Sequence, residues 1–486
     1  MTVSARIAII GAGHAGICMG MKLKDAGIDD FMILEQAATL GGTWRDNTYP
    51  GASCDAPSFL YSFSFAQKTD WSRRFAWQPE LLAYTAECAI NAGLMPHFRF
   101  RTEVTALCFD EARNRWELAC ADGSRIEAEF VVTAVGQLHR PATPAIPGRD
   151  AFEGAQFHSA RWDHAVDLTG KRVAVIGNAA SAVQFVPQIA PLAAQLTIFQ
   201  RSANWLMPRK DCLYSPRLHR WMARWPWLAR LRHQFQWFFF GEMQLTPLMK
   251  QVRVVQWLAT IKSKMHLRRQ VRDPALRAKL TPDYPIGAKR VLFNDDYYPT
   301  LNRANVRLVT DGIECIEAAG VRTRGGELAA ADVIIYATGF QATDFLAPMT
   351  ITGAGGRSLR DEWKAGARAY LGVTVSGFPN LFMLNGTTGP VGNFSLIDVA
   401  EIQFDYSMQL IEEARRRQAH QVSVKPQAAE RFENERVEAT RNTVWVSGCR
   451  SWYLDDRGIP AAWPWGFDRF REVMAQPKFE DFELVA

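Results

Sequence analysis

The eight cysteines of this 486-residue chain include no C-x-x-C pair. Scattered single cysteines disfavour a zinc site and a dithiol redox centre, and a chain of this size does not need a disulfide framework. No stretch approaches the roughly 18 uncharged apolar residues that could span a bilayer. The first ten residues lead directly into a buried-strand pattern, without the basic start and cleavage site of a signal peptide. We therefore expect a cytoplasmic protein with no metal site.

Neither the composition nor the net charge is extreme. Hydrophobic residues make up 48% and charged residues 22%, as in ordinary globular chains, and the length allows two to four domains. The net charge of +6 is unevenly spread, because residues 201–279 hold 17 Lys and Arg against three acidic residues. The rest of the chain is therefore mildly acidic.

The first glycine-rich motif follows an apolar strand at residues 7–10 and precedes a helical pattern. Gly11, Gly13 and Gly16 have the spacing in which glycines allow a tight turn, close approach of a pyrophosphate and close packing of helix on strand. A second strand ends in Glu35, 19 residues beyond Gly16, where a carboxylate accepts hydrogen bonds from ribose hydroxyls. Because Glu35 would repel a 2′-phosphate, this site should hold FAD or NAD.

A second motif begins about 165 residues later, after the strand at residues 173–176. It keeps the first glycine but has alanine at the middle and last glycine positions, and the expected binding residues are Gly177, Asn178, Ala179 and Ser181. The next strand ends in Arg201 and Ser202 with no acidic residue, and a guanidinium suits a 2′-phosphate. The second dinucleotide should therefore be NADPH.

The two units predict an α/β fold with two Rossmann-like dinucleotide-binding domains. Residues 133–136 and 337–339 are similar short segments that follow buried strands, which suggests that one layout is used twice. We expect the first part of the FAD-binding domain at 1–142 and the NADPH-binding domain at 143–335. The second part of the FAD-binding domain and the C-terminal region should occupy 336–486.

Two further segments carry a resemblance to a known family. Residues 41–55 fit G-G-x-W-x-x-x-x-Y-P-G-x-x-x-D, and residues 152–163 fit F-x-G-x-x-x-H-x-x-x-W-D. Both resemble segments of type I, FAD- and NADPH-dependent Baeyer–Villiger monooxygenases, in which the second motif lies on the linker between the two domains. Related N- and S-oxidising enzymes typically have tyrosine where this chain has Trp162. The resemblance extends from residue 7 to about 474.

The resemblance implies roles for individual residues. Arg290 would be the catalytic arginine, oriented by Asp55, and Lys289 would assist Arg201 with the 2′-phosphate. His158 would organise domain movement, and residues 451–453 would close the pocket. The loop at residues 385–390 would meet the flavin ring. Contacts to FAD would come from Thr43, Trp44, Asp55, Tyr61 and Val104, with Gly42 suited to close approach of a ligand.

The implied reaction uses NADPH and O2 to form a C4a-peroxyflavin, which inserts oxygen beside the carbonyl of a ketone and gives an ester or lactone. Heteroatom oxidation or hydroxylation of a lipophilic substrate by the same oxidant remains an alternative. A non-catalytic, NADPH-responsive flavoprotein is a second alternative.

The basic segment is also rich in tryptophan, with six between residues 201 and 279. Apolar residues at 218, 221, 222 and 225 follow helical spacing until Pro226 breaks it, which indicates a helical insert at about 206–275 of the NADPH-binding domain. A solvated basic face is the plainer interpretation. The sharper one is that the insert contacts an anionic membrane surface or admits long lipophilic substrates. Nucleic acid is not expected as a partner, because no recognition fold is evident.

Overall fold

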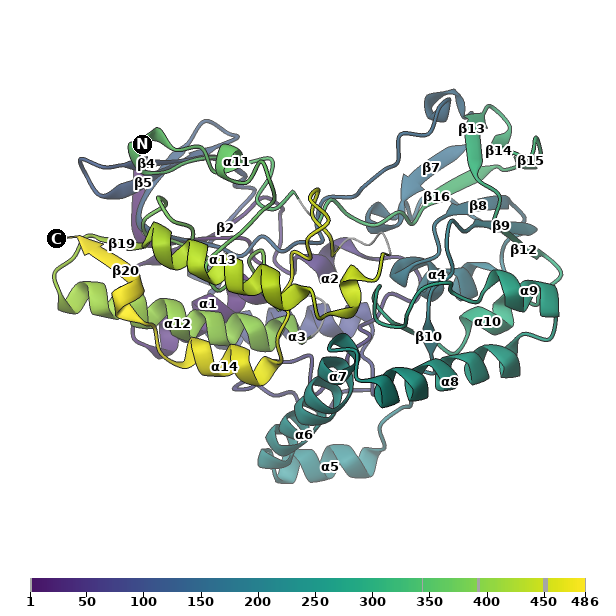
Figure 1. The fold of residues 1–486 in the computed structure, drawn as a ribbon, viewed down its shortest axis with the longest axis horizontal. Helices are drawn as coiled ribbons and strands as arrows, with labels where there is room; N and C mark the ends of the chain where they lie inside the picture. Colours follow the sequence, from purple (N-terminus) through teal and green to yellow (C-terminus); the bar gives the residue numbers. More distant parts are fainter. Residues whose placement is uncertain (1, 343, 391–393, 449–452, 486) are drawn as a thin grey trace.

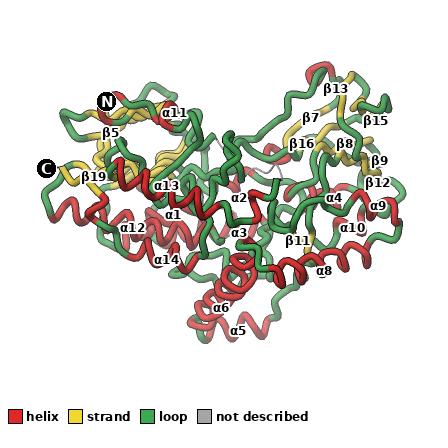
Figure 2. The backbone as a smooth tube through the Cα atoms, viewed as in Figure 1, coloured by secondary structure: helices red, strands yellow, loops and turns green. Residues whose placement is uncertain are grey.

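The computed structural model describes residues 2–342, 344–390, 394–448 and 453–485. Two β-sheets, each with its own helices, lie on opposite sides of the molecule in Figures 1 and 2.

The first sheet contains eight strands and is part parallel, part antiparallel. β1 (Thr2–Ile10) pairs in parallel with β2 (Phe31–Glu35), which in turn pairs with β3 (Phe98–Phe100). All five residues of β2 are buried, as expected for a strand covered on both faces. β4 (Val104–Asp110), β5 (Arg115–Cys120) and β6 (Arg125–Thr133) form an antiparallel meander that joins the sheet at β1.

Strand β6 pairs with two different neighbours along one edge. Its first half pairs with β5, and residues 131–133 pair in parallel with β18 (Leu381–Met383). At the far edge of the sheet, β17 (Thr350–Thr352) pairs with β4. Two strands from the last third of the chain therefore complete a sheet that begins at residue 2.

The second sheet is wholly parallel, with its strands in the order β12, β9, β8, β16, β7. Apolar clusters pack on both of its faces. One face is covered by α4 (Ala180–Ile189) and α10 (Tyr297–Thr300), and the other packs against a small three-stranded sheet. The strand bounds are β7 (Ala155–His158), β8 (Arg172–Ile176), β9 (Gln195–Phe199), β12 (Val306–Val309), β13 (Ile313–Glu317), β14 (Gly320–Thr323), β15 (Leu328–Ala330) and β16 (Val333–Tyr336).

The similar segments predicted from the sequence occupy equivalent places in the two sheets. The Ala134 N–H donates to the Ile10 carbonyl at 2.8 Å, and the Ala337 N–H donates to the Ile176 carbonyl at the same distance. In both domains the segment that follows a parallel strand, β6 or β16, thus bonds to the last residue of the strand that precedes the glycine loop, β1 or β8. The repeated layout is a property of the fold.

Two short paired strands, β10 (Leu206–Met207) and β11 (Leu292–Phe293), enclose a helical segment. Pro226 separates its first two helices, as the sequence predicts. The helices are α5 (Pro216–Arg224), α6 (Trp227–Trp237), the π-helix η4 (Phe238–Leu245), α7 (Thr246–Met249), α8 (Arg253–Gln270) and α9 (Pro274–Lys279). The domain bounds at residues 142 and 335 stay predictions.

The C-terminal region returns to the first sheet. The long helix α12 (Leu396–Arg416) packs against α1 (His14–Asp25) and α14 (Phe467–Ala475), while β19 (Gln421–Val424) pairs with β20 (Phe482–Val485). Other helices are α2 (Thr43–Asp46), α3 (Gln78–Asn91), α11 (Leu359–Glu362), α13 (Pro426–Thr440) and short 3₁₀ turns at Met95–His97, Arg149–Ala151, Ser159–Arg161, Ala354–Gly356, Val444–Val446 and Phe479–Asp481.

A buried polar network ties α6 to α12. His233 contacts the Phe59 carbonyl through Nδ1 at 2.7 Å and the Asp398 carboxylate through Nε2 at 3.1 Å. Burial acts to lower the pKa of His233, but the contact with Asp398 outweighs it, and the pKa is raised. One turn along α12, Glu401 accepts hydrogen bonds from the Ser64 N–H at 2.8 Å and the Ser64 hydroxyl at 2.5 Å. The helical segment is thus anchored by ionisable groups inside the protein.

Glu401 should make stability depend on pH. Burial raises its pKa from 4.5 to about 7, so the folded state retains a proton that the unfolded state has lost. The stabilisation is complete below pH 4.5 and is lost as pH rises through about 7. Between pH 5 and 8 wild type should lose up to about 3 kcal/mol of its free energy of unfolding to this ionisation, and Glu401→Gln, which cannot ionise, should not.

Differential scanning calorimetry of both proteins at the two pH values measures this effect. Glu412→Gln, on an exposed position of the same helix, is the matched control and should show no such difference. Identical pH dependence of wild type and Glu401→Gln would contradict the assignment.

Candidate active site

The loop between β1 and α1 is so tightly packed that glycine is required at two positions. Gly11 has φ +110°, and a Cβ there would lie 2.6 Å from the Ala134 carbonyl oxygen. A Cβ at Gly16 would lie 1.9 Å from the carbonyl oxygen of Gly11. Gly13 precedes α1 without a capping side chain, so the first N–H groups of the helix are directed at the loop and suit an anion. This geometry fits a pyrophosphate.

A pocket with about 1180 Å³ of empty space, part of it open to solvent, lies beside this loop. Of the ten residues predicted to contact FAD, Gly16, Trp44 and Asp55 do not line it. Gly16 packs against Gly11, Trp44 donates to the lining residue Tyr61, and Asp55 pairs with Arg290. The seven that do line it are Gly11, Gly13, Glu35, Gly42, Thr43, Tyr61 and Val104.

The Glu35 carboxylate is fixed in the wall of the pocket. Its oxygens accept hydrogen bonds from the N–H groups of Ala12 and Ala37 and from Arg45 Nη1, each at 2.9 Å. Two donors occupy Oε1 and one occupies Oε2, so the side chain is held in one orientation and Oε2 keeps a free lone pair. Glu35 can therefore accept a ribose hydroxyl. Arg45, which the sequence did not single out, compensates its charge.

Tyr61 connects the pocket to the buried Trp44. The Trp44 indole N–H donates to the Tyr61 hydroxyl at 3.3 Å, and the two rings meet edge to face. Burial raises the pKa of Tyr61, so its hydroxyl stays neutral. His14 packs against the Tyr61 ring, and burial lowers its pKa to about 4. His14 is therefore a neutral packing residue.

Several lining residues come from segments that carried no sequence signal for this site. Apolar side chains give no indication of which cavity they face, because packing decides it. Asn385 lies in the loop predicted to meet the flavin, and its side-chain oxygen is buried without a hydrogen-bond partner among the described residues. The unforeseen lining residues include Leu138, His139, Leu346, Pro348, Met349, Leu396 and Ile397.

The second glycine loop repeats the geometry of the first. Gly177 also has φ +110°, and a Cβ there would lie 2.3 Å from the Ala337 carbonyl oxygen. Ala179 precedes α4 without a capping side chain, so the helix N-terminus is again available to an anion. Ala182, in the place of the third glycine, is fully buried. The backbone suits a second pyrophosphate despite the two alanines.

The end of β9 differs from the end of β2 in charge. The Gly11 N–H donates to the Leu34 carbonyl and the Gly177 N–H to the Phe199 carbonyl, so Gln200 occupies the place of Glu35. A neutral amide thus replaces the carboxylate that would repel a 2′-phosphate.

Four predicted residues lie near Gln200. Asn178 Nδ2 donates to Gln200 Oε1 at 2.8 Å and to the Ser202 carbonyl at 3.0 Å. Lys289 Nζ donates to the Ser202 hydroxyl at 2.9 Å, and Arg201 is exposed next to it in the chain. Two cations therefore stand at the position where a 2′-phosphate would lie.

Arg290 and Asp55 form an ion pair, although 235 residues separate them in the sequence. Arg290 Nη2 lies 2.8 Å from both carboxylate oxygens, and Nε donates to Oδ2 at 3.1 Å. The Asp55 charge raises the pKa of Arg290 further, so the guanidinium is positive at every accessible pH. The structure thus joins the two residues predicted to be catalytic.

Arg209 supports the backbone beside Asp55. Its Nη2 donates to the Ser53 hydroxyl at 3.0 Å and to the Cys54 carbonyl at 2.8 Å, and its guanidinium lies over the Phe75 ring. Burial, followed by the Asp55 charge, raises the pKa of Cys54 to about 12, so the thiol stays protonated. Arg209 is a positioning residue that the sequence did not reveal.

Gln184 of α4, in the second domain, makes three hydrogen bonds to the loop that carries Asp55, a contact we call the Gln184 clasp. Its Oε1 accepts from the Ser53 N–H at 3.2 Å and from the Tyr49 hydroxyl at 3.0 Å, and its Nε2 donates to the Ser53 carbonyl at 3.0 Å. A Cβ at Gly51 would lie 2.9 Å from the Gln184 carbonyl oxygen. The loop that carries Asp55 is therefore packed directly on the helix of the second glycine loop.

The linker motif lies at the edge of the second sheet. His158 is buried, its Nδ1 accepts from the Ala160 N–H at 3.1 Å, and burial lowers its pKa to about 4. Trp162 packs against Phe185 of α4. Ser451 and Trp452, predicted to close the pocket, lie outside the described residues. Tyr453 is buried, which raises its pKa.

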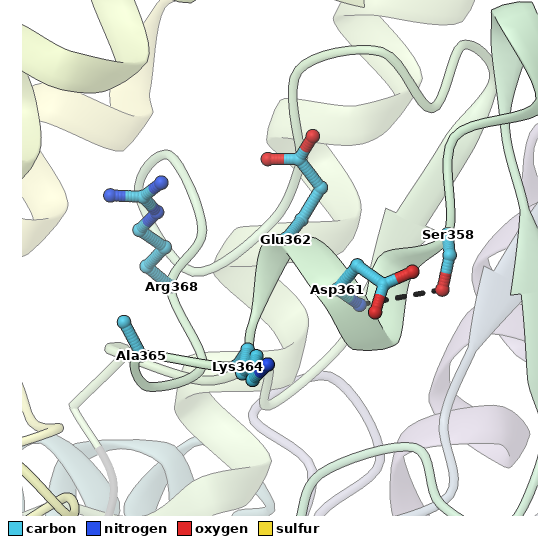
Figure 3. A pocket seen from close by; sticks show the side chains of 6 residues that line it. All are labelled: Ser358, Asp361, Glu362, Lys364, Ala365 and Arg368. Carbon is cyan, nitrogen blue, oxygen red and sulfur yellow. Dashed lines mark hydrogen bonds between the residues drawn. The ribbon is translucent and has the colours of Figure 1, made fainter.

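A separate pocket lies at the surface beside α11 (Figure 3). Its lining is Ser358, Asp361, Glu362, Lys364, Ala365 and Arg368. The Ser358 hydroxyl accepts from the Asp361 N–H at 3.3 Å and so caps the short helix. None of the predicted site residues lines this pocket, and its charged walls belong to the surface.

Comparison with known proteins agrees with this arrangement. A family model described as pyridine nucleotide-disulphide oxidoreductase matches residues 8–224. The chain is 40% identical to a Baeyer–Villiger monooxygenase of Streptomyces coelicolor over 99% of its own length and 92% of that protein. The chain belongs to the Baeyer–Villiger monooxygenase family.

Solved structures extend the similarity to the fold of the whole Baeyer–Villiger monooxygenase chain. An oxidized steroid monooxygenase bound to NADP has a TM-score of 0.89 and 31% identity, over 99% of this chain and 100% of the other. OTEMO in complex with FAD and NADP has a TM-score of 0.89 and 27% identity, with complete coverage of both chains. Both glycine loops and the ion pair lie within the matched region.

The Gln184 clasp gives a test of how the two domains are joined in this Baeyer–Villiger monooxygenase. Gln184→Leu leaves the Ser53 N–H and carbonyl without the Gln184 side chain and removes one hydrogen bond of the Tyr49 hydroxyl, which should cost about 1–3 kcal/mol of stability. Calorimetry measures the lowered melting temperature. Gln195→Leu, at an exposed position at the start of β9, is the control and should change it little. Equal melting temperatures for the two variants would show that the clasp does not stabilise the structure.

Proposed function

We propose that this chain is an FAD- and NADPH-dependent Baeyer–Villiger monooxygenase. The net reaction consumes a ketone, O2, NADPH and a proton, and yields an ester or lactone, NADP⁺ and water. The observation that carries the proposal is the Arg290–Asp55 ion pair, which stands between two loops built for dinucleotides. A fixed guanidinium is the side chain best suited to an oxygen anion.

The first pocket fits FAD. Glycine backbone at residues 11 and 16 leaves no room for a Cβ, the N-terminus of α1 is available to a pyrophosphate, and Glu35 can accept a ribose hydroxyl. Gly13, Gly42 and Thr43 line the phosphate end in our assignment, and Tyr61 and Val104 line the rest. Gly16, Trp44 and Asp55 act by supporting these contacts.

The second loop fits NADPH. Gly177, Ala179 and Ser181 surround the N-terminus of α4, and Asn178 holds the end of β9. Arg201, Ser202 and Lys289 supply the charge and hydrogen bonds for a 2′-phosphate, and Gln200 places no negative charge there. This charge difference supports our proposal that NADPH binds at the second site and FAD at the first.

When bound, FAD reduced by NADPH supplies the activation of O2. Arg290 would hold the negative charge that develops on oxygen as the ketone carbonyl carbon becomes tetrahedral. Asp55 fixes the plane of the guanidinium, while Arg209 and Gln184 hold the backbone that carries Asp55. His158 is neutral and buried, so we assign it a role in the contact between the domains and none in proton transfer.

The proposed substrate is a lipophilic ketone, and the proposed compartment is the cytoplasm. The seven described cysteines are all unpaired, which is usual in a reducing compartment. Heteroatom oxidation would use the same cofactors. Assays with ketone and sulfide panels separate the two activities, because ester formation requires migration of a carbon substituent.

Arg290 and Asp55 can be tested separately. Arg290→Ala should retain FAD and form ester at a rate reduced by roughly 10²-fold or more, because the developing negative charge loses its partner. Asp55→Asn should lose most ester formation while FAD reduction by NADPH continues. Product analysis by mass spectrometry and stopped-flow flavin absorbance measure the two steps. Wild-type rates of ester formation in Arg290→Ala would exclude the assigned role.

The second loop can be tested by adding one methyl group. Gly177→Ala places a Cβ against the Ala337 carbonyl at a positive φ, and the strain should weaken NADPH binding by roughly tenfold or more. FAD content, read from flavin absorbance, should stay near wild type. The control Gly326→Ala also has a positive φ, but a Cβ there meets nothing within 4 Å. Unchanged NADPH affinity in folded Gly177→Ala would contradict the assignment of this loop.

A further inference from the structure

The helical segment presents an apolar stripe to solvent. On α6, Trp227, Leu231 and Phe235 recur every four residues and are 58%, 53% and 66% exposed. The opposite side of the same helix, including His233, is buried against the protein. One side of α6 therefore packs on the protein, as a surface helix should. The exposed stripe of Trp227, Leu231 and Phe235 is an additional apolar face, and no other described element covers it.

The neighbouring helices expose further aromatic side chains. Trp221 of α5 and Trp257 of α8 are each 62% exposed, and Phe238 at the start of η4 is 53% exposed. Figure 1 shows α5 and α6 projecting from the lower edge of the molecule, with α8 along the same edge. We call these exposed side chains and the cations between them the aromatic–basic face.

Positive charge surrounds the apolar residues. Between Asp211 and Asp273 the chain has 12 Lys and Arg and one acidic residue, Glu242. Arg217, Arg220 and Arg224 are exposed on α5, and exposed lysines and arginines continue along α8. None of these exposed cations has an ion-pair partner among the described residues.

We propose that the aromatic–basic face docks on the surface of an anionic lipid bilayer. Exposed Trp, Phe and Leu can enter the headgroup boundary while arginine stems reach lipid phosphates. Each cation near an anionic leaflet adds attraction that salt screens. None of the described helices has the length and hydrophobicity needed to span a bilayer.

The charge and the aliphatic side chains favour lipid over other occupants. A two-fold contact with a second copy would bring the same positive face against itself. Nucleic acid could stack on tryptophan, but it offers no apolar partner to Leu231, Leu258 and Val254, which are all more than half exposed. An anionic bilayer satisfies both the charge and the aliphatic surface.

The test is co-sedimentation of the full FAD-bound chain with vesicles of phosphatidylcholine containing roughly 30% phosphatidylglycerol. We expect binding at about 0.05 M salt that falls at about 0.5 M, and little binding to phosphatidylcholine alone. Leu231→Ser/Phe235→Ser and Arg220→Gln/Arg224→Gln should each lower the partition coefficient roughly tenfold or more.

The matched control is Val3→Ser/Arg99→Gln, which changes one exposed apolar residue and one exposed cation in the first sheet. It should bind vesicles as wild type does. Flavin absorbance shows that each variant is folded.

Three outcomes would overturn the proposal. The first is an absence of wild-type binding to anionic vesicles at low salt. The second is equal partitioning of wild type and Leu231→Ser/Phe235→Ser. The third is that the wild type forms an oligomer in sedimentation velocity, or binds a single-stranded oligonucleotide, and that Leu231→Ser/Phe235→Ser abolishes this association. Vesicle binding by the same variant would be unchanged in that case.

Discussion

The ion pair between Asp55 and Arg290 sets the geometry on which the rest of the site depends. A guanidinium that meets both oxygens of a carboxylate has its plane fixed by that carboxylate. Asp55 in turn is placed by its own loop, which Gln184 and Arg209 hold through the backbone and hydroxyl of Ser53. The orientation of the one permanent cation proposed for catalysis therefore follows from how that loop packs on α4.

The two dinucleotide loops show how one backbone can be given two specificities. Gly11 and Gly177 share the same φ, and each leaves no room for a Cβ beside a backbone carbonyl. The difference lies at the end of the next strand, where Glu35 in the first domain is replaced by Gln200 in the second. Loss of one negative charge, with Arg201 next in the chain, suits a site for a 2′-phosphate.

The helical segment is joined to the first domain by a hydrogen bond between ionisable side chains. Its solvent-exposed side carries apolar side chains. His233 joins α6 to Asp398 at the start of α12, and the first residues of α12 line the pocket proposed for FAD. A surface that docks on lipid through α6 would thus be one helix layer away from that pocket. The inward side of α6 combines His233 with Leu228 and Trp237, which pack on the core, and the outward side carries a second apolar stripe.

The sequence alone predicted both glycine loops, the strand-end residues Glu35 and Arg201 and the break at Pro226, because each depends on short-range spacing. Family resemblance named Arg290 and Asp55, but their contact is decided by the fold, since 235 residues separate them. Arg45, Arg209, Gln184 and the apolar lining of the pocket had no sequence signal. A glycine pattern is local and is imposed by backbone sterics, whereas the partner of a polar side chain depends on which distant segments the packed sheets bring together.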